Sequence, residues 1–240
     1  MIKKSGLYDI NKLPTDGYIM FPISMSRITN AQNAEECYKA IEFLEKKMSA
    51  VGVDGIFLYT NGLYYNDDES ALTIRKKTNQ QMLDHKNALL KLVSKNKKYI
   101  PQSMHFIPWD YVLLNSPDFP EFFAKLKKAY EKDASFAELV KESLKNREET
   151  DANISFLLEE MALNYIIRQK LVEFPKTLVK HDKFRLFVYP GPYMKADLYI
   201  WKNKLLPQQQ TKQSNTNPYY ASQYDLEKHI IYNFDEMKDF

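Results

Sequence analysis

The chain alternates short apolar runs with longer segments in which apolar residues recur every three or four positions. Residues 18–24 form one apolar run and residues 52–60 form a second. Between them, residues 34–48 carry apolar side chains at helical spacing, namely Cys37, Ala40, Ile41, Leu44 and Met48. This pattern predicts an amphipathic helix between two buried strands. A strand, helix and strand in succession favour a parallel sheet with right-handed crossovers.

The remaining residues extend this alternation along the chain. Apolar spacing predicts helices over 71–98, over most of 119–147 and over 153–172, and strands at 105–109, 184–189 and 198–201. The polar segment 207–218 has the composition of a solvated loop, and the apolar tail after it is expected to pack back on the domain. The sequence therefore predicts a single α/β domain over 1–206, with a mostly parallel sheet flanked by helices, followed by a loop and tail over 207–240.

Composition removes several classes of protein. The six glycines are so dispersed that neither a dinucleotide-binding nor an ATP-binding glycine motif occurs. Cys37 is the single cysteine, and the four histidines have no metal-like spacing, so we expect no disulfide, no metal and no cofactor. The first residues have no apolar core of signal-peptide length, and no apolar run approaches a membrane span. We therefore expect a cytoplasmic protein.

The segment 75–98 concentrates positive charge. It holds eight basic residues against one acid, although the whole chain carries a net charge of only +3. At 100° per residue, its apolar side chains share one face and most lysines lie opposite, in a row roughly 30 Å long. Such a row suits a nucleic-acid backbone, and a merely solvated lysine face is the alternative. The candidate tRNA-binding residues are Arg75, Lys76, Lys77, Lys86, Lys91, Lys95 and Lys98.

Ser24 follows the first predicted strand. Ligands of open α/β sheets bind outside the carboxyl ends of the strands, so a serine there could act as a nucleophile, but it could also cap a helix or do neither. Three features follow it in order: the lysine-rich helix, an acidic helix over 156–165, and a strand that ends at Tyr189 and Pro190.

With these features the chain resembles the tRNA-dependent cyclodipeptide synthases. Their Rossmann-like domain is related to the catalytic domain of class-I aminoacyl-tRNA synthetases of the tyrosine and tryptophan type. The resemblance covers roughly residues 18–205 and is carried by Ile23-Ser-Met-Ser-Arg27, the helix segment Ala40-Ile-Glu-Phe-Leu44, the lysine-rich helix, the acidic helix and Tyr189-Pro190. Tyr189 and Pro190 are similar to the subfamily named for a variable residue, a tyrosine and a proline, with Arg27 as the variable residue.

The resemblance implies an enzyme that makes a cyclic dipeptide, or diketopiperazine, from two aminoacyl-tRNAs by ping-pong acyl transfer. Ser24 would become an aminoacyl-serine and then a dipeptidyl-enzyme, which cyclises. Tyr189 would orient Ser24 or the leaving ribose hydroxyl, and a helix carboxylate would hold the incoming ammonium group and shuttle its protons. The substrate pocket would include Arg27, Tyr59, Phe156 and Pro190.

The partners implied are two aminoacyl-tRNAs, with no DNA and no membrane, and the protein is expected to act as a monomer. The residues alone also leave open a non-catalytic RNA-binding protein that uses the lysine-rich helix, or a Rossmann-like hydrolase whose lysines are incidental. Replacement of Ser24 would separate the enzymes from the binding protein.

Two departures from the family pattern affect the site. The family has glycine two residues before the serine, where this chain has Pro22. The family also carries Tyr-x-x-x-Glu on one face of the acidic helix. Here Tyr165 to Gln169 keeps the tyrosine, whereas Phe156 to Glu160 keeps the acid. We prefer Glu160 as the catalytic acid and base, because glutamine can neither neutralise an ammonium group nor accept its proton, and we retain Tyr165 as a second candidate.

Overall fold

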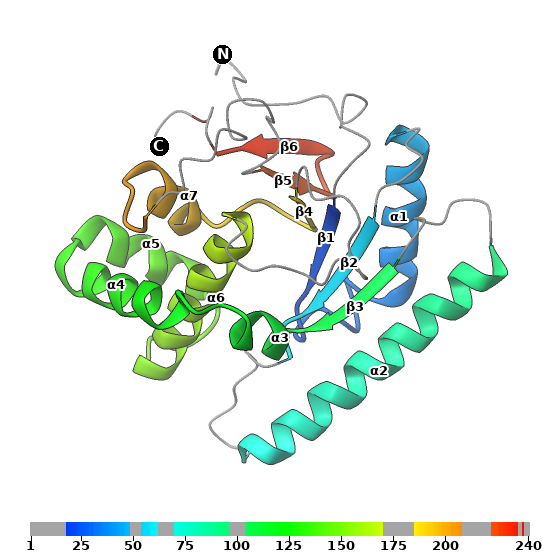
Figure 1. The fold of residues 1–240 in the computed structure, drawn as a ribbon, viewed down its shortest axis with the longest axis horizontal. Helices are drawn as coiled ribbons and strands as arrows, with labels where there is room; N and C mark the ends of the chain where they lie inside the picture. Colours follow the sequence, from blue (N-terminus) through cyan, green and yellow to red (C-terminus); the bar gives the residue numbers. More distant parts are fainter. Residues whose placement is uncertain are drawn as a thin grey trace.

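A six-stranded sheet forms the centre of the molecule (Figure 1). The computed structural model describes residues 18–48, 54–61, 70–96, 104–169, 185–207, 222–234 and 237. The strands run in the order β3-β2-β1-β4-β5-β6 and are parallel except for β6, which is antiparallel to β5. The predicted Rossmann-like α/β class is confirmed. The strands are β1 (Tyr18–Ile23), β2 (Asp54–Tyr59), β3 (Met104–Pro108), β4 (Arg185–Tyr189), β5 (Ser222–Asp225) and β6 (Ile230–Asn233).

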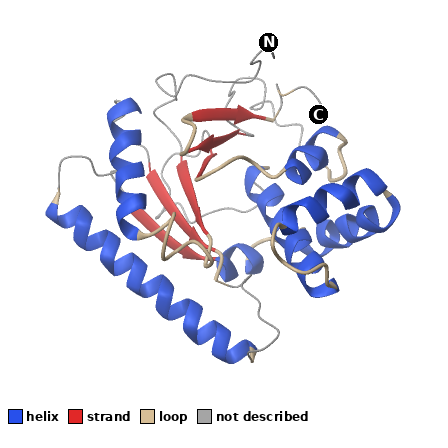
Figure 2. Ribbon diagram, turned by 180° about the vertical axis from the view of Figure 1, so that it is seen from behind, coloured by secondary structure: helices blue, strands red, loops and turns tan. Residues whose placement is uncertain are grey.

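Helices cover both faces of the sheet (Figure 2). One face carries α1 (Ala34–Met48) and α2 (Ala71–Lys95). The other face carries helices α3 to α7. Their bounds are α3 (Trp109–Leu114), α4 (Phe119–Lys132), α5 (Ala134–Leu144), α6 (Asp151–Arg168) and α7 (Lys195–Lys202).

Strand alternation divides the buried residues into two cores. Successive side chains of a strand point to opposite faces. Met20 and Phe187 therefore face α3 to α7, whereas their neighbours Phe21 and Leu186 face α1 and α2. The Phe21 and Phe57 rings stack at 4.8 Å on the α1 and α2 side. The position of a residue along a strand thus decides which of the two cores its side chain packs into.

The order of the strands reverses beside β1. The chain moves outward from β1 through β2 to β3 and then returns to place β4 on the other side of β1. Such a reversal opens a crevice outside the carboxyl ends of the two central strands, where ligands of doubly wound sheets bind. Ser24 follows β1 at this edge, and Tyr189 is the last residue of β4.

Three segments differ in detail from the predictions. The strand predicted at 198–201 is wrong, because these residues belong to α7, and a short apolar run does not distinguish a strand from a buried helix. The helix predicted over 71–98 ends at Lys95, and residues 97 and 98 lie outside the described residues. The apolar tail contributes β5 and β6 to the sheet. No helix among the described residues is both long and apolar enough to span a membrane.

Candidate active site

Hydrogen bonds hold the backbone on both sides of Ser24. The backbone N–H and the hydroxyl of Thr60 both donate to the Ile23 carbonyl, at 3.0 and 3.1 Å. The side-chain amide of Gln32 accepts from the Ser24 N–H at 2.9 Å and donates to the Pro22 carbonyl at 2.6 Å. Gln32 is only 3% exposed, so water does not compete for these bonds. The chain therefore fixes the turn at Ser24 with a buried glutamine.

A buried histidine from α2 supports the hydrogen bonds that Gln32 makes around Ser24. The His85 ring lies 3.0 Å through Nε2 from the Gln32 carbonyl oxygen and 2.8 Å through Nδ1 from the Tyr59 hydroxyl. Burial lowers the pKa of His85, which favours the neutral ring. The carbonyl only accepts, so Nε2 donates to it and Nδ1 accepts from Tyr59. The network links the lysine-rich helix to the turn that presents Ser24.

A cavity of about 600 Å³ opens beside Ser24. It lies between the carboxyl ends of β1 and β4 and the helices α5, α6 and α7, and β5 contributes Gln223. Among the described residues, no group of three or more His, Cys, Asp and Glu side chains could hold a metal ion. The lining of the cavity includes Ser24, Arg27, Lys145, Arg147, Phe156, Glu160, Asn164, Arg168, Tyr189, Asp197 and Gln223.

Helix α6 presents one aromatic and three polar side chains to the cavity in a row. Phe156, Glu160, Asn164 and Arg168 follow one another at four-residue steps, and all four line it. The row is about 18 Å long at 1.5 Å per residue. Phe156 and Glu160 are partly exposed, whereas Asn164 and Arg168 are 9% and 3% exposed. The cavity therefore deepens along α6 from Phe156 towards Arg168.

The Glu160 carboxylate is suited to receive an amine. Burial raises the pKa of Glu160, and the nearby charges of Arg147 and Lys145 oppose that rise. Among the described residues, no hydrogen bond or ion pair of this carboxylate is seen. An ammonium group in the cavity would supply both a counter-charge and hydrogen-bond donors.

Arg27 joins the turn after β1 to the turn after β4. Its guanidinium lies 5.2 Å from the centre of the Tyr189 ring, and its Nη1 donates to the Pro190 carbonyl at 2.8 Å. Burial raises the pKa of the Tyr189 phenol, although the positive charge of Arg27 lowers it. The Ser24 hydroxyl lies 2.9 Å from the Ser26 hydroxyl at the mouth of the cavity.

Comparison with solved structures identifies the fold. A cyclodipeptide synthase (CDPS) from Fluoribacter dumoffii matches 90% of this chain and 94% of its own, with a TM-score of 0.57 and 12% identity. The chain has the cyclodipeptide synthase fold. A cyclodipeptide synthase from Bacillus thermoamylovorans gives a TM-score of 0.54 at 12% identity and covers 87% of this chain and 93% of its own. No protein-family model and no curated protein matches the sequence.

A third structure connects this fold to the synthetases. The Mycobacterium tuberculosis protein has a TM-score of 0.51 at 14% identity, covering 76% of this chain and 77% of its own. Its structure is described as demonstrating that cyclodipeptide synthetases are related to type I tRNA synthetases.

Within the cyclodipeptide synthase fold, the cavity brings five of the predicted site residues together and leaves three outside. Its lining includes Ser24, Arg27, Phe156, Glu160 and Tyr189 but not Tyr59, Tyr165 or Pro190.

Strand alternation and helix geometry account for two of the three residues outside the lining, Tyr59 and Tyr165. Tyr59 belongs to the core under α1 and α2 and bonds His85 there. Tyr165 lies five residues, or about 140°, around α6 from Glu160, and its hydroxyl donates to the Leu206 carbonyl at 3.3 Å. The Pro190 carbonyl accepts a hydrogen bond from the Arg27 guanidinium.

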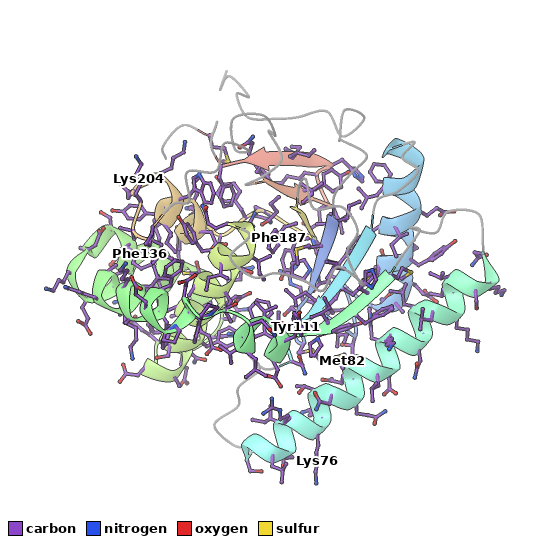
Figure 3. The ribbon with its side chains drawn as sticks, in the orientation of Figure 1. Lys76, Met82, Tyr111, Phe136, Phe187 and Lys204 are labelled. Atoms are coloured by element: carbon purple, nitrogen blue, oxygen red, sulfur yellow. The ribbon has the colours of Figure 1, made fainter. Side chains whose placement is uncertain are left out.

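Helix α2 presents most of its basic residues to the surface (Figure 3). Lys76, labelled in the figure, points away from the sheet, and Lys77, Lys91 and Lys95 are exposed as well. The remaining candidate residues of α2 are in different surroundings. Arg75 is exposed and pairs with Asp110, and the Lys86 ammonium lies 5.3 Å from the centre of the Phe106 ring. Lys98 is outside the described residues, and Leu72, Leu83 and Leu90 interrupt the cationic surface.

Most residues of the site were not among the sequence predictions. Asn164 and Arg168 continue the four-residue spacing that starts at Phe156, so this spacing could have found them. Gln32 reaches the site from a loop, Asp197 from α7 and Gln223 from a late strand, and no local pattern marks them.

Proposed function

We propose that this protein is a tRNA-dependent cyclodipeptide synthase of the Tyr-Pro subfamily. It would convert two aminoacyl-tRNAs into a cyclic dipeptide and two tRNAs. The observation that carries the proposal is the meeting of Ser24, Tyr189 and the Glu160 carboxylate in one cavity, at the switch point of a cyclodipeptide synthase fold. Arg27, Tyr189 and Pro190, the three residues that resemble the subfamily, are in mutual contact, which supports the finer assignment.

In the first step, the Ser24 hydroxyl attacks the ester carbonyl of an aminoacyl-tRNA. The bond between that carbonyl and the ribose oxygen breaks, the tRNA leaves with the proton, and an aminoacyl-serine ester remains. Tyr189 is the candidate to orient the hydroxyl or the leaving ribose oxygen. The substrate ester is already activated, so the reaction needs no nucleoside triphosphate. The lack of a glycine-rich phosphate loop is consistent with this chemistry.

In the second step, the α-amine of the serine-bound residue attacks the ester carbonyl of the second aminoacyl-tRNA. A peptide bond forms, the second tRNA leaves, and a dipeptidyl-serine results. The free amine of the dipeptide then attacks the Ser24 ester, which closes the ring and restores the hydroxyl. Each amine must lose a proton before it attacks, and Glu160 is the candidate to accept that proton and return it to the leaving oxygen.

The two tRNAs require a surface that binds phosphates without reading sequence. The exposed lysines of α2 fit that role, because lysine acts as a point charge on a rigid helix. Lys145 and Arg147 add positive charge at the cavity itself, where the acceptor end would enter. We place the reaction in the cytoplasm, where aminoacyl-tRNAs are made.

Expression in a bacterial host tests the proposal. Mass spectrometry of the culture medium should detect diketopiperazines with the wild-type protein and none with Ser24→Ala or with an empty vector. Ser24→Ala should still bind tRNA, because the serine lies away from α2. Absence of product from wild-type cells, together with absence of product from purified protein and mixed aminoacyl-tRNAs, would contradict the proposal and favour the non-catalytic RNA-binding protein.

A further inference from the structure

The deep end of the cavity contains two polar side chains for which no hydrogen bond is seen in the described part of the chain. Asn164 on α6 is 9% exposed and Asp197 on α7 is 8% exposed, and both line the cavity. No hydrogen bond or ion pair of either side chain is seen among the described residues. Buried polar groups are normally satisfied, so an amide and a carboxyl open to a cavity indicate a polar ligand.

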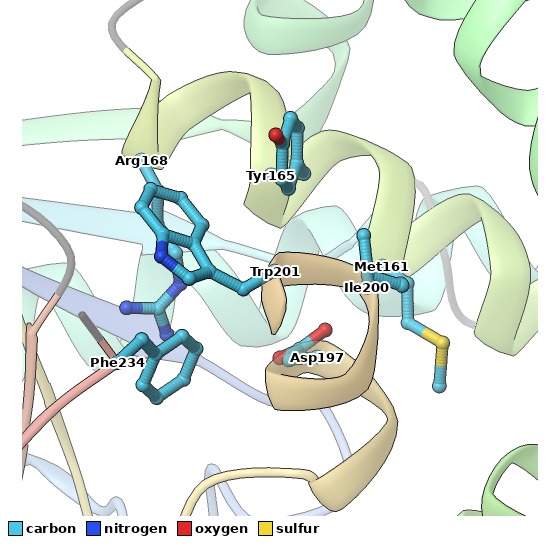
Figure 4. A pocket seen from close by; sticks show the side chains of 7 residues that line it. All are labelled: Met161, Tyr165, Arg168, Asp197, Ile200, Trp201 and Phe234. Atoms are coloured by element: carbon cyan, nitrogen blue, oxygen red, sulfur yellow. The ribbon is translucent and has the colours of Figure 1, made fainter. Parts of the chain in front are cut away.

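A fixed positive charge lies beside Asp197. The Arg168 guanidinium is 4.1 Å from the Phe187 ring centre and 4.7 Å from the Phe234 ring centre, and its Nη2 donates to Gln223 at 3.1 Å. Figure 4 shows Asp197 on α7 and Arg168 on α6 in a smaller pocket, also lined by Tyr165 and Trp201, which shares these two residues with the cavity. Burial raises the pKa of Asp197 to about 7, an effect that the charge of Arg168 opposes and the charge of Glu160 increases.

The charges at this end of the cavity restrict what it can bind. A cationic side chain would add a second positive charge next to Arg168, and an acidic one would face Asp197 and Glu160. An apolar side chain would leave Asn164 and Asp197 desolvated without hydrogen bonds. A neutral hydroxyl or carboxamide supplies the donor that a carboxylate needs and pairs with an amide in either direction.

Helix geometry relates this end of the cavity to the amine site. Asn164 follows Glu160 by one turn, which is about 6 Å along the axis. An amino acid whose ammonium group meets Glu160 can therefore extend a short side chain towards Asn164 and Asp197.

We propose that Asn164 and Asp197 form a subsite for the neutral polar side chain, a carboxamide or a hydroxyl, of one aminoacyl substrate. The subsite rests on the proposed cyclodipeptide synthase activity and adds the class of amino acid to it. Arg168 keeps the subsite close to electrically neutral, and Glu160 holds the α-ammonium of the same residue.

The test compares diketopiperazines made in a bacterial host by the wild type, Asn164→Leu and Asp197→Leu. Both replacements are close in size to the original side chain and remove its hydrogen bonds. We expect wild-type products to contain Asn, Gln, Ser or Thr. Each leucine variant should shift the ratio of polar to apolar products by roughly tenfold or more, since a site built on hydrogen bonds rejects the analogue that lacks them. Asp118→Asn is the control, because Asp118 is a partly exposed acid that does not line the cavity.

Two results would overturn the subsite while leaving the enzyme intact. These are wild-type products with apolar side chains only, and an unchanged product ratio in both leucine variants. No diketopiperazine from any variant and no Ser24 adduct would instead remove the proposed function and the subsite with it. If the leucine variants do not fold, purified wild type settles the question. It should use asparaginyl-tRNA at least about tenfold faster than leucyl-tRNA, and equal rates would refute the subsite.

Discussion

Charged side chains lie in different places on the two faces of the sheet. Under α1 and α2, the described core is mainly apolar, with Phe57 and Leu89 fully buried and His85 hydrogen-bonded on both sides of its ring, and the charges of α2 lie mostly on its surface. On the other face, α5, α6 and α7 leave a cavity that contains Glu160 and Asp197. A surface lysine costs little free energy, whereas a buried carboxyl without a partner costs a great deal. The cavity residues are therefore the stronger evidence for chemistry, and the lysines are evidence only for binding.

The largest effect should come from neutralising the cavity carboxylate. Glu160→Gln keeps the shape of the side chain but can neither balance an ammonium charge nor accept its proton. We expect product formation to fall by about 10²- to 10⁴-fold, with tRNA binding unchanged. The measurement is the rate of diketopiperazine formation from purified aminoacyl-tRNAs.

Glu159 provides a matched control for this substitution. It is the neighbouring acid on α6, is partly buried, and also has a pKa raised by burial, but it does not line the cavity. Glu159→Gln should retain near wild-type activity. Equal losses in the two variants would show that a general change in α6 explains the effect of Glu160→Gln.

A smaller loss of activity should follow from removing the two hydrogen bonds of the Gln32 side chain beside Ser24. Gln32→Leu leaves the Ser24 N–H and the Pro22 carbonyl without their partner, so the nucleophile is less well positioned. We expect kcat to fall about ten- to a hundredfold with little change in KM, since each unsatisfied buried group costs about 1–3 kcal/mol.

Gln32→Glu separates this positioning role from a loss of stability. It keeps an acceptor for Ser24 but loses the donor to Pro22, so its kcat should lie between those of the wild type and Gln32→Leu. A Gln32→Leu enzyme with unchanged kcat and a lower melting temperature would assign the glutamine to stability alone.

Changes on the opposite face should affect binding without affecting chemistry. Replacing Lys91 and Lys95 by glutamine should raise KM for aminoacyl-tRNA several-fold and leave kcat unchanged. The slope of log affinity against log salt should fall by about 1 for each phosphate that the variant no longer neutralises. Lys128 and Lys132 on α4 have the same four-residue spacing and are also exposed, so their double glutamine variant is the control. Equal salt slopes in the two double variants would remove α2 as the tRNA-binding surface.

The smallest effect concerns stability. The folded-state pKa of Asp197 is raised to about 7 from an ordinary value of 3.8, with Arg168 and Glu160 as the charges that act on it. Its stabilising contribution is therefore complete below pH 3.8 and is lost as the pH rises towards 7. Asp197→Asn should melt at a higher temperature than the wild type, and the difference should widen by a few degrees between about pH 5 and pH 8. A difference that does not change with pH would contradict the effect of burial on Asp197.

Sequence patterns predicted the elements that have a regular period and missed contacts that cross the fold. Apolar spacing identified α1, and alternating burial could also have placed Tyr59 on the opposite face from the cavity. The bond between Gln32 and Ser24 joins two positions of an irregular loop and depends on His85, which lies 53 residues further along the chain. Such contacts have no local pattern, so they became visible only in the folded chain.

The choice between Glu160 and Tyr165 illustrates the same limit. In sequence, both registers of the acidic helix keep part of the family pattern. In the fold, Glu160 lines the cavity and the Tyr165 hydroxyl bonds the Leu206 carbonyl. The direction in which α6 faces the sheet separates the two residues, and that direction depends on packing against α4, α5 and α7.

The most direct test of the central claim is the intact mass of the purified protein after brief incubation with a pool of aminoacyl-tRNAs. The wild type should gain the mass of an aminoacyl group, and peptide mapping should locate it on Ser24. Ser24→Ala should gain nothing. A wild-type protein that binds tRNA but never carries an acyl group, or an adduct that persists in Ser24→Ala, would contradict the account.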